Sequence, residues 1–277
     1  MEIPREWIRY WDLTGEPFAP SSPYVPLPSH QEAASRLVQA IETGERLAIL
    51  KGKPGMGKSR LLRKILQEAR GSNRRIALVC NPRSGAAMAA GLAAVLGRRP
   101  VGSIDPKAAW STLERQLCIG SLEATAVVLA VDDVKLSADR NWLDSLMRLT
   151  SIPPGRKTLL LTATDLPAEA PRCLSWARCV VLKPLECREV AQYLQVKLAA
   201  VGGSGELFSG RAVTRLHFLS GGAPRGIDRL ASLSLMAGAA ERLEAISSEV
   251  VDNVAGECPN LVTSVPQLDC STRLPCP

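Results

Sequence analysis

The chain has 277 residues, of which 46% are hydrophobic and 22% are charged, as in an ordinary globular protein with a buried core. No stretch approaches the roughly 18 uninterrupted apolar residues of a membrane span, so we expect no integral membrane segment. The net charge of +7 permits nucleic acid or an anionic surface as a partner without requiring either. The amino terminus lacks the apolar core of a signal peptide, which predicts a cytoplasmic protein.

The eight cysteines are not spaced for disulfides, zinc or redox chemistry, because no C-x-x-C pair occurs. Five of them stand singly in apolar or helical stretches and are expected to be small buried hydrophobes: Cys80, Cys118, Cys173, Cys179 and Cys187. The other three lie in a proline-containing tail and have no predicted role: Cys258, Cys270 and Cys276.

The chain opens with a segment rich in aromatic residues and proline, 1–28, which we expect to be irregular and to pack on the domain that follows. A helix is predicted over 29–43 and ends at Gly44. An apolar strand over 46–50 then leads into a glycine-rich loop, and a helix begins near Lys58. Strand, loop and helix in this order are the context in which phosphate-binding loops occur.

The loop from Gly52 to Ser59 fits the pattern G-x-x-x-x-G-K-[ST] at every fixed position. Glycine permits backbone angles that let successive N–H groups turn towards phosphate oxygens. Lys58 is predicted to reach the β- and γ-phosphates, and the Ser59 hydroxyl to ligate Mg²⁺. The alternative is a glycine-rich turn that happens to contain a lysine. The predicted nucleotide cradle consists of Gly52, Lys53, Pro54, Gly55, Met56, Gly57, Lys58, Ser59 and Arg60.

Further strand-like runs alternate with helical stretches beyond this loop. The strands are predicted over 75–80, 126–131, 158–162 and 179–182, and one of the helices over 110–119. Buried strands that alternate with helices indicate a parallel sheet covered on both faces. We therefore expect an α/β nucleotide-binding domain over 29–184.

The pattern changes after Pro184, where four helices follow one another with short Gly or Ser breaks. They are predicted over 186–198, 210–219, 226–239 and 247–254. These residues indicate a smaller all-helical domain over 185–255. The remaining residues, 256–277, read as a flexible tail that contains cysteine and proline.

The strand over 126–131 ends in two acids, Asp132 and Asp133. An acid at the carboxyl end of a strand beside a phosphate loop is placed to hold Mg²⁺, and this role is predicted for Asp132. Asp133 is then the candidate base that polarises the attacking water. The alternative is that the two acids only form a turn.

Two later positions are candidates to sense the γ-phosphate. The strand over 158–162 is followed by polar residues, so either Thr162 or Thr164 is placed to bond that phosphate or the lytic water. Arg225 lies at the start of a helix in the smaller domain, and it is a candidate to reach the bound phosphates when the domains close. An ordinary strand threonine and a solvated arginine are the alternatives.

The chain resembles the AAA+ ATPases in the order of four features. These are a phosphate loop, a strand that ends in acids, a polar strand end and a helix that starts with G-x-P-R. More narrowly, the chain resembles the ExeA/GspA group of general-secretion ATPases and their transposition relatives of the TniB type. The shared features beyond these motifs are short segments spread along the chain: 10–18 (YWDLTGEPF), 29–33 (SHQEA), Asn81-Pro82, Val131-Asp132-Asp133, 182–185 (LKPL) and Tyr193.

The resemblance implies an α/β P-loop NTPase fold of the AAA+ type, with a parallel sheet domain and a smaller all-helical lid domain. It also implies ATP with Mg²⁺ as cofactors, homo-oligomers, and an arginine supplied to each site by a neighbouring subunit. Arg178 matches that arginine and Arg172 is the runner-up; an ordinary surface arginine is the alternative. The chain departs from the group at Asp133, where glutamate is usual, and at Thr164, where glutamine is frequent.

The leading interpretation is a cytoplasmic, Mg²⁺-dependent ATPase whose ATP binding or hydrolysis drives oligomer assembly or the remodelling of a partner complex. The alternative is an ATP-dependent switch on double-stranded DNA, of the transposition-regulator type, with slow or no turnover. A third option is a nucleotide-binding interaction module that never hydrolyses ATP. The residues do not distinguish a protein partner from double-stranded DNA.

Overall fold

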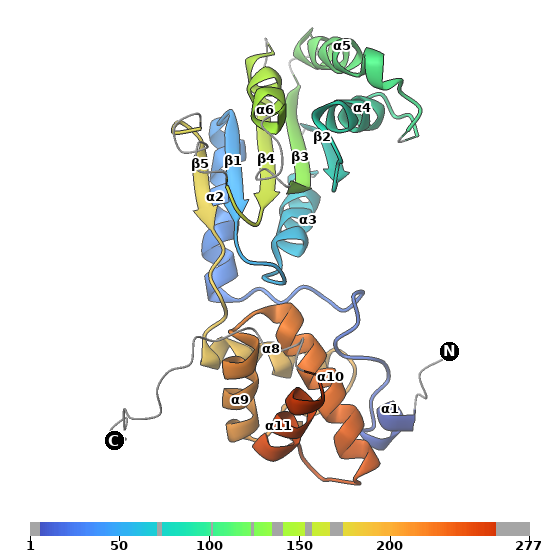
Figure 1. The fold of residues 1–277 in the computed structure, drawn as a ribbon, viewed down its shortest axis with the longest axis vertical. Coiled ribbons are helices and arrows are strands. Elements are labelled where there is room, and N and C mark those ends of the chain that lie inside the picture. The colour runs from blue at the N-terminus through green and yellow to red at the C-terminus, as the bar shows by residue number, and fades with distance from the viewer. Residues whose placement is uncertain are drawn as a thin grey trace. The chain divides into compact units, whose positions relative to one another are not determined.

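The structure is a computed structural model and describes residues 6–70, 74–100, 102–122, 125–134, 141–152, 157–166 and 174–258. The chain divides into two compact units (Figure 1). One, the sheet unit, is Pro28–Lys183. The other, the helical unit, combines Met1–Leu27 with Pro184–Pro277, so the chain passes from one unit to the other twice.

The described residues of the sheet unit form a sheet of five strands, all parallel, in the order β2-β3-β4-β1-β5. Their bounds are β1 (Leu47–Lys51), β2 (Arg74–Cys80), β3 (Ala126–Val134), β4 (Lys157–Ala163) and β5 (Arg178–Val181). Because the strands are parallel, their carboxyl ends meet at one edge of the sheet. The loop after β1 and the acids of β3 therefore lie at the same edge.

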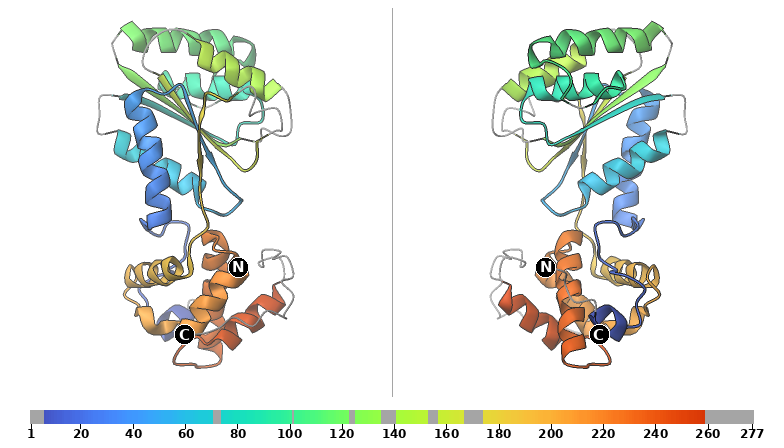
Figure 2. Two further views of the ribbon diagram at one scale, coloured as in Figure 1. Left: turned by 90° about the vertical axis from the view of Figure 1, so that its left-hand side faces the viewer. Right: turned by 90° about the vertical axis from the view of Figure 1, so that its right-hand side faces the viewer.

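Helices cover both faces of the sheet (Figure 2). One face carries α2 (Pro28–Thr43) and α3 (Lys58–Ala69), and the other α4 (Gly85–Leu96), α5 (Ala109–Leu122) and α6 (Asn141–Ser151), with a 3₁₀ turn at Pro106–Ala108. Leu47 and Ile49 of β1 belong to the core cluster beneath α4, α5 and α6. Ala48 and Leu50, also buried, alternate with them and point to the opposite face, as the period of a strand requires.

The helical unit contains α1 (Glu6–Tyr10), α8 (Cys187–Ala199), a 3₁₀ turn at Gly205–Leu207, α9 (Gly210–Ser220), α10 (Pro224–Ala240) and α11 (Ser248–Glu257). The aromatic opening segment is part of its core. Trp7, Trp11 and Phe18 are buried with Leu194 and Leu235 in one hydrophobic cluster. The expectation that this segment packs on the domain that follows is therefore wrong, because it joins the carboxyl-terminal helices. Outside the five residues of α1, its described part is irregular, as expected.

Polar contacts join the same opening segment to the helices. The indole Nε1 of Trp11 donates to the carbonyl oxygen of Leu235 over 2.8 Å. Thr14 donates its hydroxyl to the carbonyl oxygen of Val201 over 3.1 Å. Lys197, fully buried on α8, donates to the hydroxyl of Ser22. A buried ammonium needs such partners, because leaving it unpaired in apolar surroundings costs on the order of several kcal/mol.

The prediction of buried cysteines is wrong for the described residues. Cys80, Cys118 and Cys179 are exposed and Cys187 is partly buried, as is Cys258; Cys173, Cys270 and Cys276 lie outside the described residues. The reason is position: Cys80 ends β2, and Cys179 lies on the edge strand β5.

Within the described ranges, no three His, Cys, Asp or Glu side chains lie close enough together to hold a metal ion. No helix there has the length and apolar character to cross a bilayer.

Candidate nucleotide-binding site

The loop between β1 and α3 has the backbone conformation that its glycines make possible. Gly55 and Gly57 have φ of 81° and 89°, in the left-handed region where a side chain would be strained. Gly52 lies so close to Leu182 that an added Cβ would meet its carbonyl oxygen at 3.3 Å. The loop therefore turns tightly from the end of a buried strand into the first turn of α3, whose amino end favours anions.

Lys58, the first residue of α3, turns its side chain back over the loop. The side chain is buried, and its Nζ donates to the carbonyl oxygens of Gly52 over 2.6 Å and Lys53 over 3.1 Å. These contacts hold the ammonium at the loop rather than in solvent. A phosphate in the loop would meet a positive charge that is already in position.

Ser59, the next residue, reaches the end of β3. Its hydroxyl donates to Oδ1 of Asp132 over 2.9 Å. Asp132 is buried, and the same Oδ1 accepts a second bond, 2.6 Å long, from the hydroxyl of Thr162 at the end of β4. Two residues 73 positions apart in the chain thus place a hydroxyl and a carboxylate oxygen side by side. Hard oxygen donors of this kind are the ligands that Mg²⁺ takes in proteins.

Asp133 differs from Asp132 in conformation and exposure. The register of β3 against β4 is irregular between Val131 and Val134, and Asp133 has a left-handed φ of 57°. Its backbone N–H donates to the Thr162 hydroxyl over 2.7 Å, and its side chain is exposed while Asp132 is buried. The bulge therefore gives the two adjacent acids different environments, one fixed by hydroxyls and one facing solvent.

Thr162 joins these two acids through one hydroxyl, which donates to the Asp132 carboxylate and accepts from the Asp133 N–H. The sequence left Thr162 and Thr164 as alternatives. Thr164 lies one residue beyond β4 and is partly exposed, and its role as a phosphate sensor stays a prediction. A further residue that the sequence analysis missed is Arg63 on α3, whose Nη2 lies 3.8 Å from Oδ2 of Asp132.

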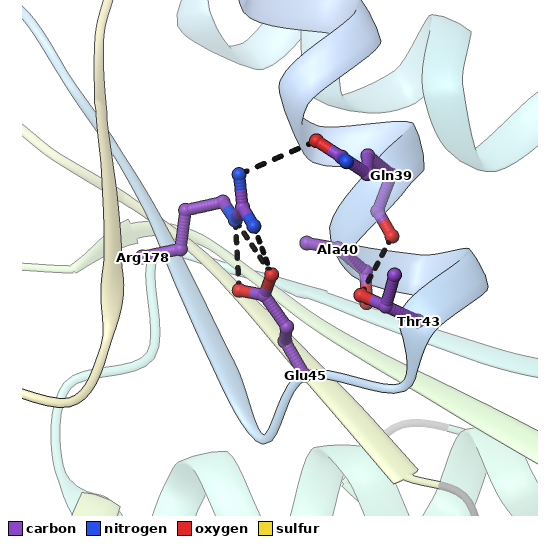
Figure 3. Close-up of polar contacts among 5 residues, drawn as sticks. All are labelled: Gln39, Ala40, Thr43, Glu45 and Arg178. Atoms are coloured by element: carbon purple, nitrogen blue, oxygen red, sulfur yellow. Dashed lines mark hydrogen bonds and ion pairs between the residues drawn. The ribbon is translucent and has the colours of Figure 1, made fainter.

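Arg178 is engaged in a different part of the sheet unit (Figure 3). Its Nε donates to both carboxylate oxygens of Glu45, over 2.7 and 2.8 Å, and Nη2 also bonds that carboxylate. Nη1 contacts the amide oxygen of Gln39 at 3.4 Å. The hydrogen bonds from Arg178 hold the pKa of the Glu45 carboxyl below its usual value, and the carboxylate in turn raises the pKa of the arginine.

Arg178 pairs in register with Ala48, whereas the phosphate loop follows Lys51, about 10 Å further along the strand. Any contact of this arginine with phosphate would thus have to be made on another copy of the chain, and that role stays a prediction.

The other predicted arginines lie elsewhere. Arg60 is partly buried in the first turn of α3. Arg225 is exposed in the first turn of α10, in the helical unit, and its sensing role also stays a prediction. Arg172 lies outside the described residues.

The role of the Thr162 hydroxyl in holding Asp132 can be tested without measuring any enzymatic activity. In a Thr162→Val variant the buried Asp132 carboxylate loses a donor, and we expect the free energy of unfolding to fall by about 1–3 kcal/mol. Thr162→Ser should recover most of this loss, because it restores the hydroxyl. Thr164→Val is the matched control and should shift the urea unfolding midpoint little. An equal loss in both valine variants would contradict the assignment of the hydroxyl network to Thr162.

Comparison with known proteins identifies the fold. No family model matches the sequence, and no curated protein matches it. Solved structures do match: a chain of the Drosophila origin recognition complex (ORC) bound to DNA has a TM-score of 0.69 at 16% identity, over 91% of this chain and 65% of that one. The ORC1 protein of Aeropyrum pernix in complex with DNA gives 0.64 at 17%, over 87% and 68%.

A third match is Cdc6p of Pyrobaculum aerophilum, with a TM-score of 0.62 at 16% identity, over 87% of this chain and 70% of that one. This chain thus spans about two thirds of the length of the proteins it matches. At such identities the likeness establishes the fold alone. The chain has the α/β fold of the AAA+ P-loop NTPases, with a five-stranded parallel sheet and a smaller helical unit.

Proposed function

We propose that this chain is a Mg²⁺-dependent ATPase in which ATP binding or hydrolysis drives oligomer assembly or the remodelling of a partner complex, as in the ExeA-like group that its sequence resembles. The observation that carries the proposal is the bond between the Ser59 hydroxyl and the Asp132 carboxylate beside a complete phosphate loop. In P-loop NTPases, this pair of groups holds the metal.

In the proposed site, the backbone from Gly52 to Arg60 surrounds the phosphates. Lys58 contacts the β- and γ-phosphates, from a position it already holds at the loop. Ser59 and Asp132 would hold Mg²⁺, and the oxygen donors 2.9 Å apart fit that ion. When bound, Mg²⁺ neutralises charge on the β- and γ-phosphate oxygens. Thr162 fixes the Asp132 carboxylate in the orientation this requires.

Hydrolysis needs a group that orients the attacking water, and Asp133 is the proposed base. Its side chain is exposed and is one methylene shorter than a glutamate, so we propose slow turnover or stimulation by a partner. Thr164, Arg178 from a neighbouring copy and Arg225 are proposed to sense or stabilise the γ-phosphate. An Asp133→Glu variant with faster turnover would support a site whose rate is set by the short side chain.

The second candidate is an ATP-dependent switch on double-stranded DNA, and the charge distribution favours it. The sheet unit carries 24 of the 34 Lys and Arg but 13 of the 27 Asp and Glu, so Pro28–Lys183 has a net charge of +11 against +7 for the whole chain. Two of the matching structures are described as bound to DNA. Excess positive charge on one unit supports phosphate-backbone binding, which weakens steeply with salt.

One experiment tests the ATPase and separates the two candidates. ATP hydrolysis is measured with Mg²⁺, with and without double-stranded DNA, for the wild type and for Asp133→Asn. We expect Mg²⁺-dependent turnover that falls by about 10²–10⁴-fold in the variant, which is the usual contribution of a general base. Stimulation by DNA, lost at high salt, would favour the switch. Nucleotide binding without turnover under any condition would contradict the ATPase and leave a binding module.

A further inference from the structure

The two oxygens of the Asp132 carboxylate have different neighbours. Oδ1 accepts from the hydroxyls of Ser59 and Thr162, whereas Oδ2 lies 3.8 Å from Nη2 of Arg63. The Asp132 side chain is 4% exposed and that of Arg63 is 58% exposed. One oxygen is therefore fixed by buried hydrogen bonds, and the other faces a cation that reaches in from the surface.

Arg63 owes this position to the helix that also carries the proposed metal ligand. Ser59 and Arg63 are four residues apart on α3, so their side chains lie on one face of the helix, one turn apart. The same Nη2 lies 3.9 Å from Sγ of Cys80 at the end of β2. The guanidinium thus spans the carboxyl ends of two neighbouring strands, β2 and β3, whose residues Cys80 and Asp132 pair in register.

We propose that Arg63 is a built-in counter-ion of Asp132 that competes with Mg²⁺ for this carboxylate, and so sets the Mg²⁺ concentration at which the site loads. The inference rests on the proposed function, because it takes Asp132 as a metal ligand. A separation of 3.8 Å is an ion pair without a hydrogen bond, and such a pair at an exposed side chain changes an equilibrium constant by at most about fivefold. Arg63 can therefore leave for solvent at small cost when the metal arrives.

The competing assignment for Arg63 is direct contact with a nucleotide phosphate. The two roles predict opposite effects when the charge is removed. A competitor's removal strengthens metal binding and leaves metal-free nucleotide binding unchanged. Removal of a phosphate ligand weakens nucleotide binding even when EDTA has taken away the metal.

The test compares Arg63→Gln with Lys64→Gln. Lys64 is the next residue on α3, is similarly exposed, and pairs with Glu68 rather than with Asp132, so its replacement removes the same charge from the same helix. The first measurement titrates the nucleotide-free protein with Mg²⁺ alone and follows its thermal unfolding midpoint. We expect Arg63→Gln to reach half of the maximal rise at about fivefold lower Mg²⁺ than wild type, the factor for one unit charge near 4 Å in water.

The second measurement follows binding of a fluorescent ATP analogue, in EDTA and across a Mg²⁺ titration. We expect Arg63→Gln to match wild type in EDTA and to need less Mg²⁺, while Lys64→Gln matches wild type in both. Equal Mg²⁺ dependence in the two variants, or weaker binding of Arg63→Gln in EDTA, would overturn the proposal. Failure of the wild type to bind the analogue at all would instead contradict the proposed function, and the titration with Mg²⁺ alone would still decide the role of Arg63.

Discussion

A Lys58→Ala variant is expected to bind ATP on the order of a hundredfold more weakly than the wild type, since charge-assisted hydrogen bonds are individually worth about 1.5–3 kcal/mol. The ammonium already lies at the phosphate loop, held by the carbonyl oxygens of Gly52 and Lys53. Its contacts with phosphate thus need little rearrangement. Hydrolysis should fall to background in the same variant. Isothermal titration with ATP and Mg²⁺ measures the change in affinity.

Lys53→Ala is the matched control, because it removes the same charge from the same loop. The Lys53 side chain is exposed, and its predicted contribution to the cradle is its backbone N–H, which alanine keeps. We expect its affinity for ATP to stay within about threefold of wild type, as for a screened surface charge. Equal losses in the two variants would mean that the loop attracts ATP only by its general charge, and would contradict the specific role of Lys58.

The sequence predicted the elements that local patterns determine. The phosphate loop follows from glycine and lysine at fixed spacing, and the apolar runs that became β1, β2, β3 and β4 are too short and too continuous for surface helices. The contact between Ser59 and Asp132 could also be predicted from the sequence. In a parallel sheet, the loop after one strand and the acids after another must lie at the same edge.

Contacts between distant residues that follow no motif were not predictable. Glu45 and Arg178 are 133 positions apart, and nothing in either local sequence indicates that one carboxylate takes two nitrogens of that guanidinium. The bulge at Asp133 was missed for a related reason. A left-handed φ at a non-glycine residue depends on the neighbouring strand, here on the Thr162 hydroxyl that accepts the Asp133 N–H.

The expected packing partner of the aromatic opening segment was wrong because the residues that cover this segment lie far along the chain. Trp11 bonds the carbonyl oxygen of Leu235, 224 positions away. Next to this contact, Gly238 leaves the space that the indole fills, since an added Cβ would meet Cζ2 of Trp11 at 3.1 Å. An aromatic residue near the amino terminus and a glycine inside a late helix are complementary only in the folded chain.

This complementarity leads to the largest stability effect that we predict. Trp11→Ala should lower the free energy of unfolding of the helical unit by about 3–5 kcal/mol, as for other large aromatic residues removed from a core. The Trp11 side chain is buried in the cluster that contains Leu194 and Leu235. Trp11→Phe keeps a ring in that cluster and loses the N–H, so we expect a smaller loss, about 1 kcal/mol from the hydrogen bond.

The measurement is urea unfolding followed by circular dichroism and tryptophan fluorescence, because two units can unfold in separate transitions. Trp176→Ala is the control: that indole is 45% exposed and belongs to the sheet unit, so its loss should shift the midpoint much less. If Trp11→Ala were no more destabilising than this control, the opening segment would not be part of the helical core. If the loss is as large as expected, truncation of residues before Leu27 would unfold helices that lie more than 150 positions later in the chain, because they share one core with it.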